Sequence, residues 1–299
     1  MDGVGVTADG FGLRGPHGWA FRGVGLDAEP GSLIAVEGPS GSGRTSLLLA
    51  LTGRMKATEG TAAVGGARLP KQLAAARRVS ALAHVAGVTD LDPALTVGEH
   101  LRERALLERR FGGPVRELLR PRAERAAAVG LRIDTALAAA GLDREALPKG
   151  SRTAVRDLER LESLRLSVAL ALIGRPGLLG VDDIDLKLTD AERGEVWALL
   201  GSLTEAGTTV LAVCGEAPEG TVTVRTGPQA APLDREEAEE APARKDAVEA
   251  RGPEDDIESC DEPAAESGRT TAESAESSEP AGSEQEEEKT DAIAETGRP

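Results

Sequence analysis

Aromatic side chains are scarce in this sequence of 299 residues, which contains no tyrosine, three phenylalanines and two tryptophans. The apolar residues are mainly alanine, leucine and valine. Because apolar residues make up 40% of the chain, they are numerous enough to bury a core. The length allows one large domain or two smaller ones.

Cysteine is also scarce. The two cysteines are Cys214, which lies in an apolar run, and Cys260, which lies among acidic residues. Two cysteines in such different surroundings predict neither a disulfide framework nor a zinc site, and they fit a reducing cytosol.

Long hydrophobic runs are absent as well, since no stretch approaches 18 uninterrupted apolar residues. The N-terminal residues Met1, Asp2 and Gly3 do not begin a basic segment followed by an apolar one, which is the pattern of an export signal. We therefore expect a cytoplasmic protein that neither spans a membrane nor is exported by itself. Any membrane role would require a partner.

The chain has no excess of positive charge. Residues 228–299 contain 23 acidic and 7 basic residues, whereas residues 1–227 contain 28 of each. The net charge of −16 thus belongs to the C-terminal segment. The neutral remainder gives no electrostatic reason to expect a nucleic-acid partner.

Residues 228–299 are expected to form an acidic disordered tail. Glutamate runs at residues 236–240 and 286–288 alternate with Ala, Ser, Pro and Gly, and this composition cannot bury enough apolar area to offset chain entropy. Both a solubilising tail and a docking or regulatory tail fit the pattern.

Hydrophobic patterning in residues 1–227 predicts alternating strands and helices. The expected strands are residues 3–6, 19–26, 32–37, 177–181 and 208–213, and the expected helices are residues 45–51, 97–108, 123–140, 152–173 and 190–206. Residues 32–36 form a continuous apolar run, as in a strand that is buried on both faces. The alternation indicates an α/β fold with a parallel sheet covered by helices.

The segment between the buried strand 32–37 and the next helix has the Gly-x4-Gly spacing of a Walker A phosphate loop. Glycines allow the backbone N–H groups to turn inward around phosphates, and the helix that follows adds its positive N-terminal end. The alternative is a Gly/Ser-rich turn that happens to precede a helix. The residues expected to hold a nucleotide are Gly38, Pro39, Ser40, Gly41, Ser42, Gly43, Arg44, Thr45 and Ser46.

Arg44 stands where this motif usually has lysine. Arginine keeps the charge and binds phosphate, but its planar fork is larger and aimed differently. The loop therefore predicts nucleotide binding better than it predicts stabilisation of a transition state.

Two consecutive carboxylates follow the apolar strand at residues 178–181. Asp182 is expected to hold Mg²⁺ together with the hydroxyl of Thr45. Asp183 would polarise the attacking water, although its side chain is one methylene shorter than the glutamate usual there. The alternative is an acidic turn at the end of a strand.

Three further stretches resemble the ATP-binding subunits of ABC transporters. They are ATEGTAAVGG at residues 57–66, DPALTVGEHL at residues 92–101 and VALALIGRPGLL at residues 168–179. The resemblance implies a P-loop NTPase fold with a mainly parallel central sheet, a small antiparallel β subdomain and an inserted helical subdomain at about residues 88–165. The ATP-binding domain would span residues 1–227, followed by the tail at 228–299.

The sequence also departs from the family at several motifs. The glutamine of the Q-loop falls near Gly87, and the switch histidine falls near Gly215. The signature glycines are missing from residues 160–164, where only Ser163 could serve. The aromatic residue that stacks on adenine falls near Arg14; Phe11 and Trp19 are close enough to replace it, although Trp19 could equally pack on its strand.

The resemblance implies an ATP-binding subunit that uses ATP and Mg²⁺ to drive or gate a transmembrane permease, with impaired hydrolysis. Its partners would be that permease subunit and, in a homo- or heterodimer, another ATP-binding subunit. It would then be peripheral at the inner face of the cell membrane. Two alternatives are a non-hydrolysing, nucleotide-dependent regulatory protein on the same fold and another P-loop NTPase or small-molecule kinase; LTV at residues 95–97 and the wide spacing of the two Walker motifs argue against the latter.

Overall fold

The computed structural model describes residues 2–111 and 121–227, so the predicted tail at residues 228–299 lies outside the described residues. A five-stranded sheet forms the centre of the fold in the order β6-β7-β8-β3-β9, and all its neighbouring strands are parallel. The strands are β3 (Leu33–Glu37), β6 (Ser80–Ala83), β7 (Leu178–Val181), β8 (Thr209–Cys214) and β9 (Val222–Arg225). Every residue of β6, β7 and β8 is buried, as expected for strands covered on both faces.

A second sheet is antiparallel and has the order β2-β1-β4-β5. Its strands are β1 (Val6–Gly15), β2 (Gly18–Ala28), β4 (Glu59–Val64) and β5 (Ala67–Leu69). The strand expected at residues 3–6 begins instead at Val6 and continues to Gly15. The register is irregular between Ala8 and Phe11, and Gly10, with φ 55°, lies at this bulge within a paired strand.

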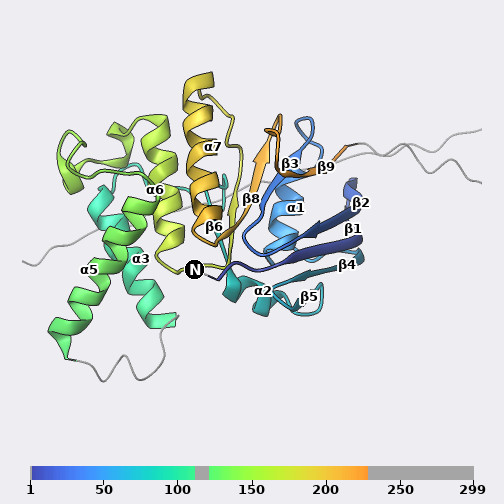
Figure 1. The fold of residues 1–299 in the computed structure, drawn as a ribbon, viewed down its shortest axis with the longest axis horizontal. Coiled ribbons are helices and arrows are strands. Elements are labelled where there is room, and N and C mark those ends of the chain that lie inside the picture. The colour runs from blue at the N-terminus through green and yellow to red at the C-terminus, as the bar shows by residue number, and fades with distance from the viewer. Residues whose placement is uncertain (1, 112–120, 228–299) are drawn as a thin grey trace, which may run out of the picture. The chain divides into compact units, whose positions relative to one another are not determined.

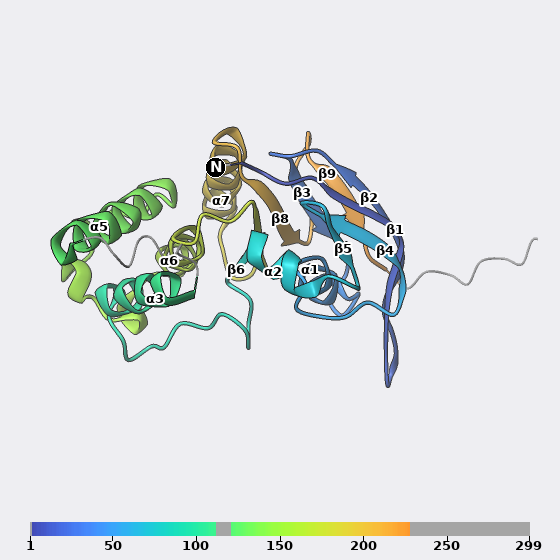
Figure 2. The ribbon, with the colours of Figure 1, turned by 90° about the horizontal axis from the view of Figure 1, so that it is seen from below.

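Among the described residues, three helices form a group on the side of the central sheet away from the antiparallel sheet (Figures 1 and 2). They are α3 (Val97–Phe111), α5 (Arg122–Ala139) and α6 (Arg160–Leu172). Between the two sheets lies α1 (Arg44–Leu51), whose buried Leu47, Leu48 and Leu51 share one hydrophobic core with strand residues of both sheets. Burial of α1 from both sides fixes the N-terminal end of the helix against the central sheet.

The remaining helices are α2 (Leu73–Val79) and α7 (Asp190–Glu205). A capping box starts α7, because the side chain of Thr189 accepts a hydrogen bond from the N–H of Glu192 while Glu192 bonds back to the N–H of Thr189. None of the helices among the described residues has the length and apolar character needed to cross a bilayer.

The helix expected at residues 152–173 begins later, at Arg160. Glu159 and Glu162 form its capping box, and two short 3-10 turns, Gly150–Arg152 and Val155–Asp157, precede it. This segment pairs with the chain ahead of α3, since the N–H of Val97 donates to the carbonyl of Thr153. Tertiary backbone pairing therefore replaces the first two helical turns that the local composition suggested.

Candidate functional site

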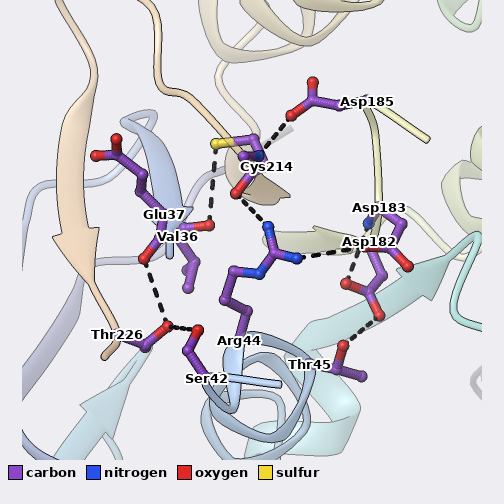
Figure 3. A network of polar contacts seen from close by, with 11 residues as sticks. Val36, Glu37, Ser42, Arg44, Thr45, Asp182, Asp183, Asp185, Cys214 and Thr226 are labelled. Atoms are coloured by element: carbon purple, nitrogen blue, oxygen red, sulfur yellow. Dashed lines mark hydrogen bonds and ion pairs between the residues drawn. The ribbon is translucent and has the colours of Figure 1, made fainter. Parts of the chain in front are cut away.

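The candidate site lies at the carboxyl edge of the parallel sheet, where the loop at residues 38–43 joins β3 to α1 (Figure 3). The pairing of β7 with β8 and of β8 with β3 brings Asp182, just after β7, and Cys214, the last residue of β8, to the same edge. Residues from three distant parts of the sequence thus surround the start of α1. Ligand sites of open α/β sheets form at this edge.

Two glycines of the loop are required by close backbone contacts. Gly43 has φ 86° at the N-cap of α1, and a Cβ atom there would lie 1.9 Å from the carbonyl oxygen of Ala20. A Cβ atom at Gly38 would lie 2.2 Å from the carbonyl oxygen of Thr226. No larger residue fits at either position without moving the backbone.

The Asp182 side chain is buried and joined to the loop. Its Oδ2 accepts a hydrogen bond of 2.8 Å from Oγ1 of Thr45, and its Oδ1 accepts one of 3.1 Å from the N–H of Asp183. Burial raises the pKa of the Asp182 carboxyl, the charge of Asp183 raises it further, and the bond from Thr45 opposes both.

The carboxylate of Asp182 and the hydroxyl of Thr45 fit a hard divalent cation. A buried carboxylate with a raised pKa gains from a nearby positive charge, and Mg²⁺ prefers oxygen ligands. The described part of the chain has no group of three His, Cys, Asp or Glu side chains that could enclose a metal. Mg²⁺ commonly takes one or two protein oxygens and completes its shell with water and substrate phosphates.

Arg44 is directed across the site to the ends of two neighbouring strands. Its Nη1 donates to the carbonyl oxygen of Cys214 at 2.5 Å, and its Nη2 lies 4.0 Å from Oδ1 of Asp183. Only 15% of the Arg44 side chain is exposed. The guanidinium therefore contacts Cys214 and Asp183 and is not directed only into the loop.

Asp183 adopts a left-handed backbone conformation, with φ 44°, directly after the buried Asp182. Its side chain is 42% exposed, so water can reach the carboxylate. Aspartate tolerates this conformation better than most residues. The strand end thus presents one buried carboxylate and one solvent-accessible carboxylate.

Of the two aromatic candidates for stacking on a base, only Trp19 is accessible. Phe11 is fully buried, with its ring centroid 5.9 Å from that of Phe21, so it belongs to the core. Trp19 is 40% exposed, and the guanidinium of Arg22 lies 4.7 Å from its ring centroid. The guanidinium of Arg14 lies over the same ring, 5.7 Å from its centroid, so Trp19 is already paired with two cations.

The structure adds two residues that the sequence analysis did not single out. His84 follows β6 with φ 56°, and its N–H donates to Oγ of Ser167 at 2.7 Å. Burial lowers the pKa of His84, Arg160 lowers it further, and Asp183 and Asp90 oppose the shift. Thr226 follows β9 and bonds to Ser42 within the loop.

The expected position of the family signature lies at the start of α6. Ser163 is in the first turn of this helix, where its N–H donates to the carbonyl of Glu159, and its neighbour Leu164 is buried. The backbone here is helical, and this segment has no paired glycines.

A loop of this geometry between β3 and α1, with an acidic residue after β7, which β8 separates from β3 in the same parallel sheet, defines a P-loop nucleotide-binding fold. The family described as "ABC transporter" matches residues 21–185, more than half of the chain. The chain belongs to this family.

Proteins similar to this chain include two bacterial ATP-binding proteins. The chain is 33% identical over 187 residues to the Nod factor export ATP-binding protein I of Cupriavidus metallidurans, with 62% of this chain and 54% of that protein covered. It is 30% identical over 207 residues to the Daunorubicin resistance ATP-binding protein DrrA3 of Streptomyces coeruleorubidus, with 69% and 58% covered. The aligned part of the chain therefore spans little more than half the length of these relatives.

Similar solved structures share the fold. One is a dimeric ATP-binding cassette in a post-hydrolysis state bound to ADP and Pi, with TM-score 0.55, 22% identity and coverage of 71% of this chain and 88% of that chain. Another is cbiO1 from Clostridium perfringens, part of the ABC transporter complex cbiONQ, with TM-score 0.56, 17% identity and 71% and 78% coverage. The expected α/β fold, with its parallel sheet, antiparallel sheet and inserted helices, is confirmed.

Proposed function

We propose that this chain binds MgATP as the ATP-binding subunit of an ABC transporter, and that it drives or gates a partner permease with impaired hydrolysis. The observation that carries the proposal is the hydrogen bond between Thr45 and the buried Asp182 beside a glycine-rich loop. A buried carboxylate here has little structural purpose without a cation, because burial disfavours its charged form.

In this proposal the loop at residues 38–43 and the first turn of α1 hold the phosphates through backbone N–H groups, and Ser46 lies in that turn. Thr45 and Asp182 would hold Mg²⁺. When bound, that ion would neutralise phosphate charge. Trp19 is available to stack on the base.

Arg44 and Asp183 support the proposal of impaired hydrolysis. The bond from Nη1 of Arg44 to the carbonyl of Cys214 fixes the direction of the guanidinium, so only its remaining N–H groups, held in that direction, are free to donate to a phosphate. Asp183 would polarise the attacking water, but its carboxylate faces this cation at 4.0 Å.

The alternative is a non-hydrolysing protein whose partner binding depends on nucleotide occupancy. Mg²⁺-dependent ATPase activity of the purified protein, lost in Asp183→Asn, would eliminate that alternative. Nucleotide binding without turnover, even with a membrane partner present, would count against the motor function. Asp157→Asn is a matched control, because it also removes an exposed carboxylate that pairs with basic side chains but lies far along the chain from the loop.

A permease partner is supported by the names of the relatives, which describe export and resistance ATP-binding proteins. On this chain, Val88 and Leu107 are 51% and 44% exposed and border a cavity of about 520 Å³ beside α3 and α6. Exposed apolar side chains around a hollow are typical of interaction sites. We assign this face to the permease, which would keep the chain at the inner face of the membrane.

The permease assignment is tested by co-purification with the multi-spanning membrane protein encoded by a neighbouring gene. Leu107→Asp is expected to abolish co-purification, whereas Leu131→Asp, a matched change at a 66% exposed leucine of α5, leaves it intact. Equal retention of the permease by both variants would refute the assignment. The proposed dimer with another ATP-binding subunit, and the division into a domain at residues 1–227 and a tail at 228–299, remain parts of the proposal.

A further inference from the structure

Thr226 contacts both ends of the phosphate loop from outside it. Its N–H donates to the carbonyl oxygen of Glu37 at 2.8 Å, just before the loop begins. Its Oγ1 lies 2.8 Å from Oγ of Ser42, near the end of the loop, within hydrogen-bond distance (Figure 3). One residue of a distant segment thus joins the two limbs of the loop.

The contact is buried and closely fitted. Thr226 is 4% exposed and Ser42 is 8% exposed, so water does not readily replace either partner. The carbonyl oxygen of Thr226 also lies 2.2 Å from where a Cβ atom of Gly38 would be. With Thr226 in this place, the loop therefore accommodates only a glycine at position 38.

Strand β9 holds Thr226 in place. This strand pairs in parallel with β3, and its last residue, Arg225, lies opposite Glu37. Thr226 directly follows the strand, so the pairing with β3 fixes its position. The Thr226 hydroxyl has one other acceptor, the carbonyl of Glu37, at 3.4 Å, which is long for an O–H···O bond. Ser42 is therefore the main partner of this hydroxyl.

We propose that Thr226 is a positioning residue of the phosphate loop, which fixes Gly38 and Ser42 in the conformation that binds nucleotide. The inference rests on the proposed nucleotide-binding function of the loop. A loop that is already held in its binding conformation loses less conformational freedom when the phosphates arrive. Removing the Thr226 hydroxyl leaves the Ser42 hydroxyl without this partner. It thereby weakens the link that Thr226 makes between the two ends of the loop.

The test measures ATP affinity by calorimetry in the presence of Mg²⁺ for the full chain and three variants. Thr226→Val keeps the shape but removes the hydroxyl, and we expect affinity to fall about three- to tenfold, the effect of one net hydrogen bond. Thr226→Ser restores the hydroxyl and should bind as the unmodified protein does. Thr223→Val is the matched control, because Thr223 lies on the same strand and its hydroxyl is within hydrogen-bond distance of Thr221, away from the loop.

A double-mutant cycle separates positioning from general loosening of β9. If Thr226 acts through Ser42, the combination of Ser42→Ala with Thr226→Val binds ATP no more weakly than the weaker single variant. Additive losses would overturn the proposal, as would unchanged affinity of Thr226→Val. Failure of the unmodified protein to bind any nucleotide would overturn the proposed function together with this inference, so the two failures are distinguishable.

Hydrogen exchange provides a test that needs no variant. Because coupling between the loop and Thr226 is reciprocal, bound ATP should slow exchange of the Thr226 amide, which donates to Glu37. The amide of Val196, in the buried middle of α7, should be unaffected and serves as the internal reference. Exchange at Thr226 that is unchanged by saturating nucleotide contradicts the proposal.

Discussion

The Nη1 atom of Arg44 donates a hydrogen bond of 2.5 Å to the carbonyl oxygen of Cys214, and so joins the first residue of α1 to the last residue of β8. The carbonyl fixes the direction of the guanidinium, and Asp183 lies 4.0 Å from its other terminal nitrogen. The guanidinium of Arg44, which follows the phosphate loop, is thereby held by contacts within the protein. In the proposed function, this arrangement would allow nucleotide binding while impairing turnover.

Replacing Arg44 by lysine should release the Cys214 carbonyl and raise the affinity for MgATP. An ammonium group is compact, and its three donors can rotate toward phosphate oxygens. A charge-assisted hydrogen bond to phosphate corresponds to a gain of about tenfold in affinity. Calorimetric titration of Arg44→Lys with ATP tests this, and the same protein should show faster phosphate release in an ATPase assay.

Arg44→Ala is the companion variant. It removes the positive charge from the site, so affinity should fall below that of the unmodified protein, and loss of the bond to Cys214 should reduce the free energy of unfolding by about 1–3 kcal/mol. Unchanged ATP affinity in Arg44→Ala would contradict a role of this charge in nucleotide binding. A lower affinity of Arg44→Lys than of the unmodified protein would show that the guanidinium itself binds the phosphates.

The hydroxyl of Thr45 should be needed for the effect of Mg²⁺ on ATP binding. Thr45→Val removes the donor to Asp182 and a ligand for the cation, while Thr45→Ser keeps both. We expect the Mg²⁺-dependent part of the affinity to be lost in the valine variant and retained in the serine variant. Titrations with ATP in Mg²⁺ and in EDTA measure it; equal Mg²⁺ dependence in both variants would contradict the assignment of Thr45.

Gly43 and Gly41 provide a matched test of the loop backbone. Both have left-handed φ values, 86° and 80°, so alanine at either position costs about 1–2 kcal/mol in backbone strain. A Cβ atom at Gly41 meets nothing within 4 Å, whereas one at Gly43 meets the carbonyl of Ala20. Gly43→Ala should therefore lower the free energy of unfolding in urea by clearly more than Gly41→Ala, and equal losses would contradict the described contact.

The thiol of Cys214 should be inert in the folded protein. Burial raises its pKa to about 12, helped by the charges of Asp185 and Glu37, so at pH 8 the thiol stays protonated and is a poor nucleophile. In a Cys260→Ser variant, which retains one thiol, a thiol reagent should react slowly with the native protein and completely in urea. Rapid reaction of the native protein at pH 8 would contradict this environment.

The candidate site at the carboxyl edge of the sheet was predictable because its signals are local. The glycine spacing at residues 38–43 and the apolar run before Asp182 each lie within ten residues of sequence, and the structure brings Thr45 and Asp182 together as these signals indicated. The apolar residues that form the buried strand before Asp182 are the same residues whose pattern predicts that strand. Such patterns need no knowledge of distant partners.

Other parts depended on long-range contacts that the sequence does not display. Strand β6, Ser80–Ala83, has three small residues and one leucine, and its pairing with β7 makes it a strand. Thr226 lies 189 positions from Glu37, so nothing in its neighbourhood marks it as part of the loop. The aim of Arg44 toward Cys214 likewise depends on the register of β3 with β8.

Calorimetric titration of the unmodified full chain with ATP, in Mg²⁺ and in EDTA, tests the central claim most directly. The account predicts saturable binding at one site per chain, tighter with Mg²⁺, because the loop offers backbone donors and the Thr45–Asp182 pair offers oxygens for the cation. Absence of saturable binding up to millimolar ATP under both conditions would contradict it.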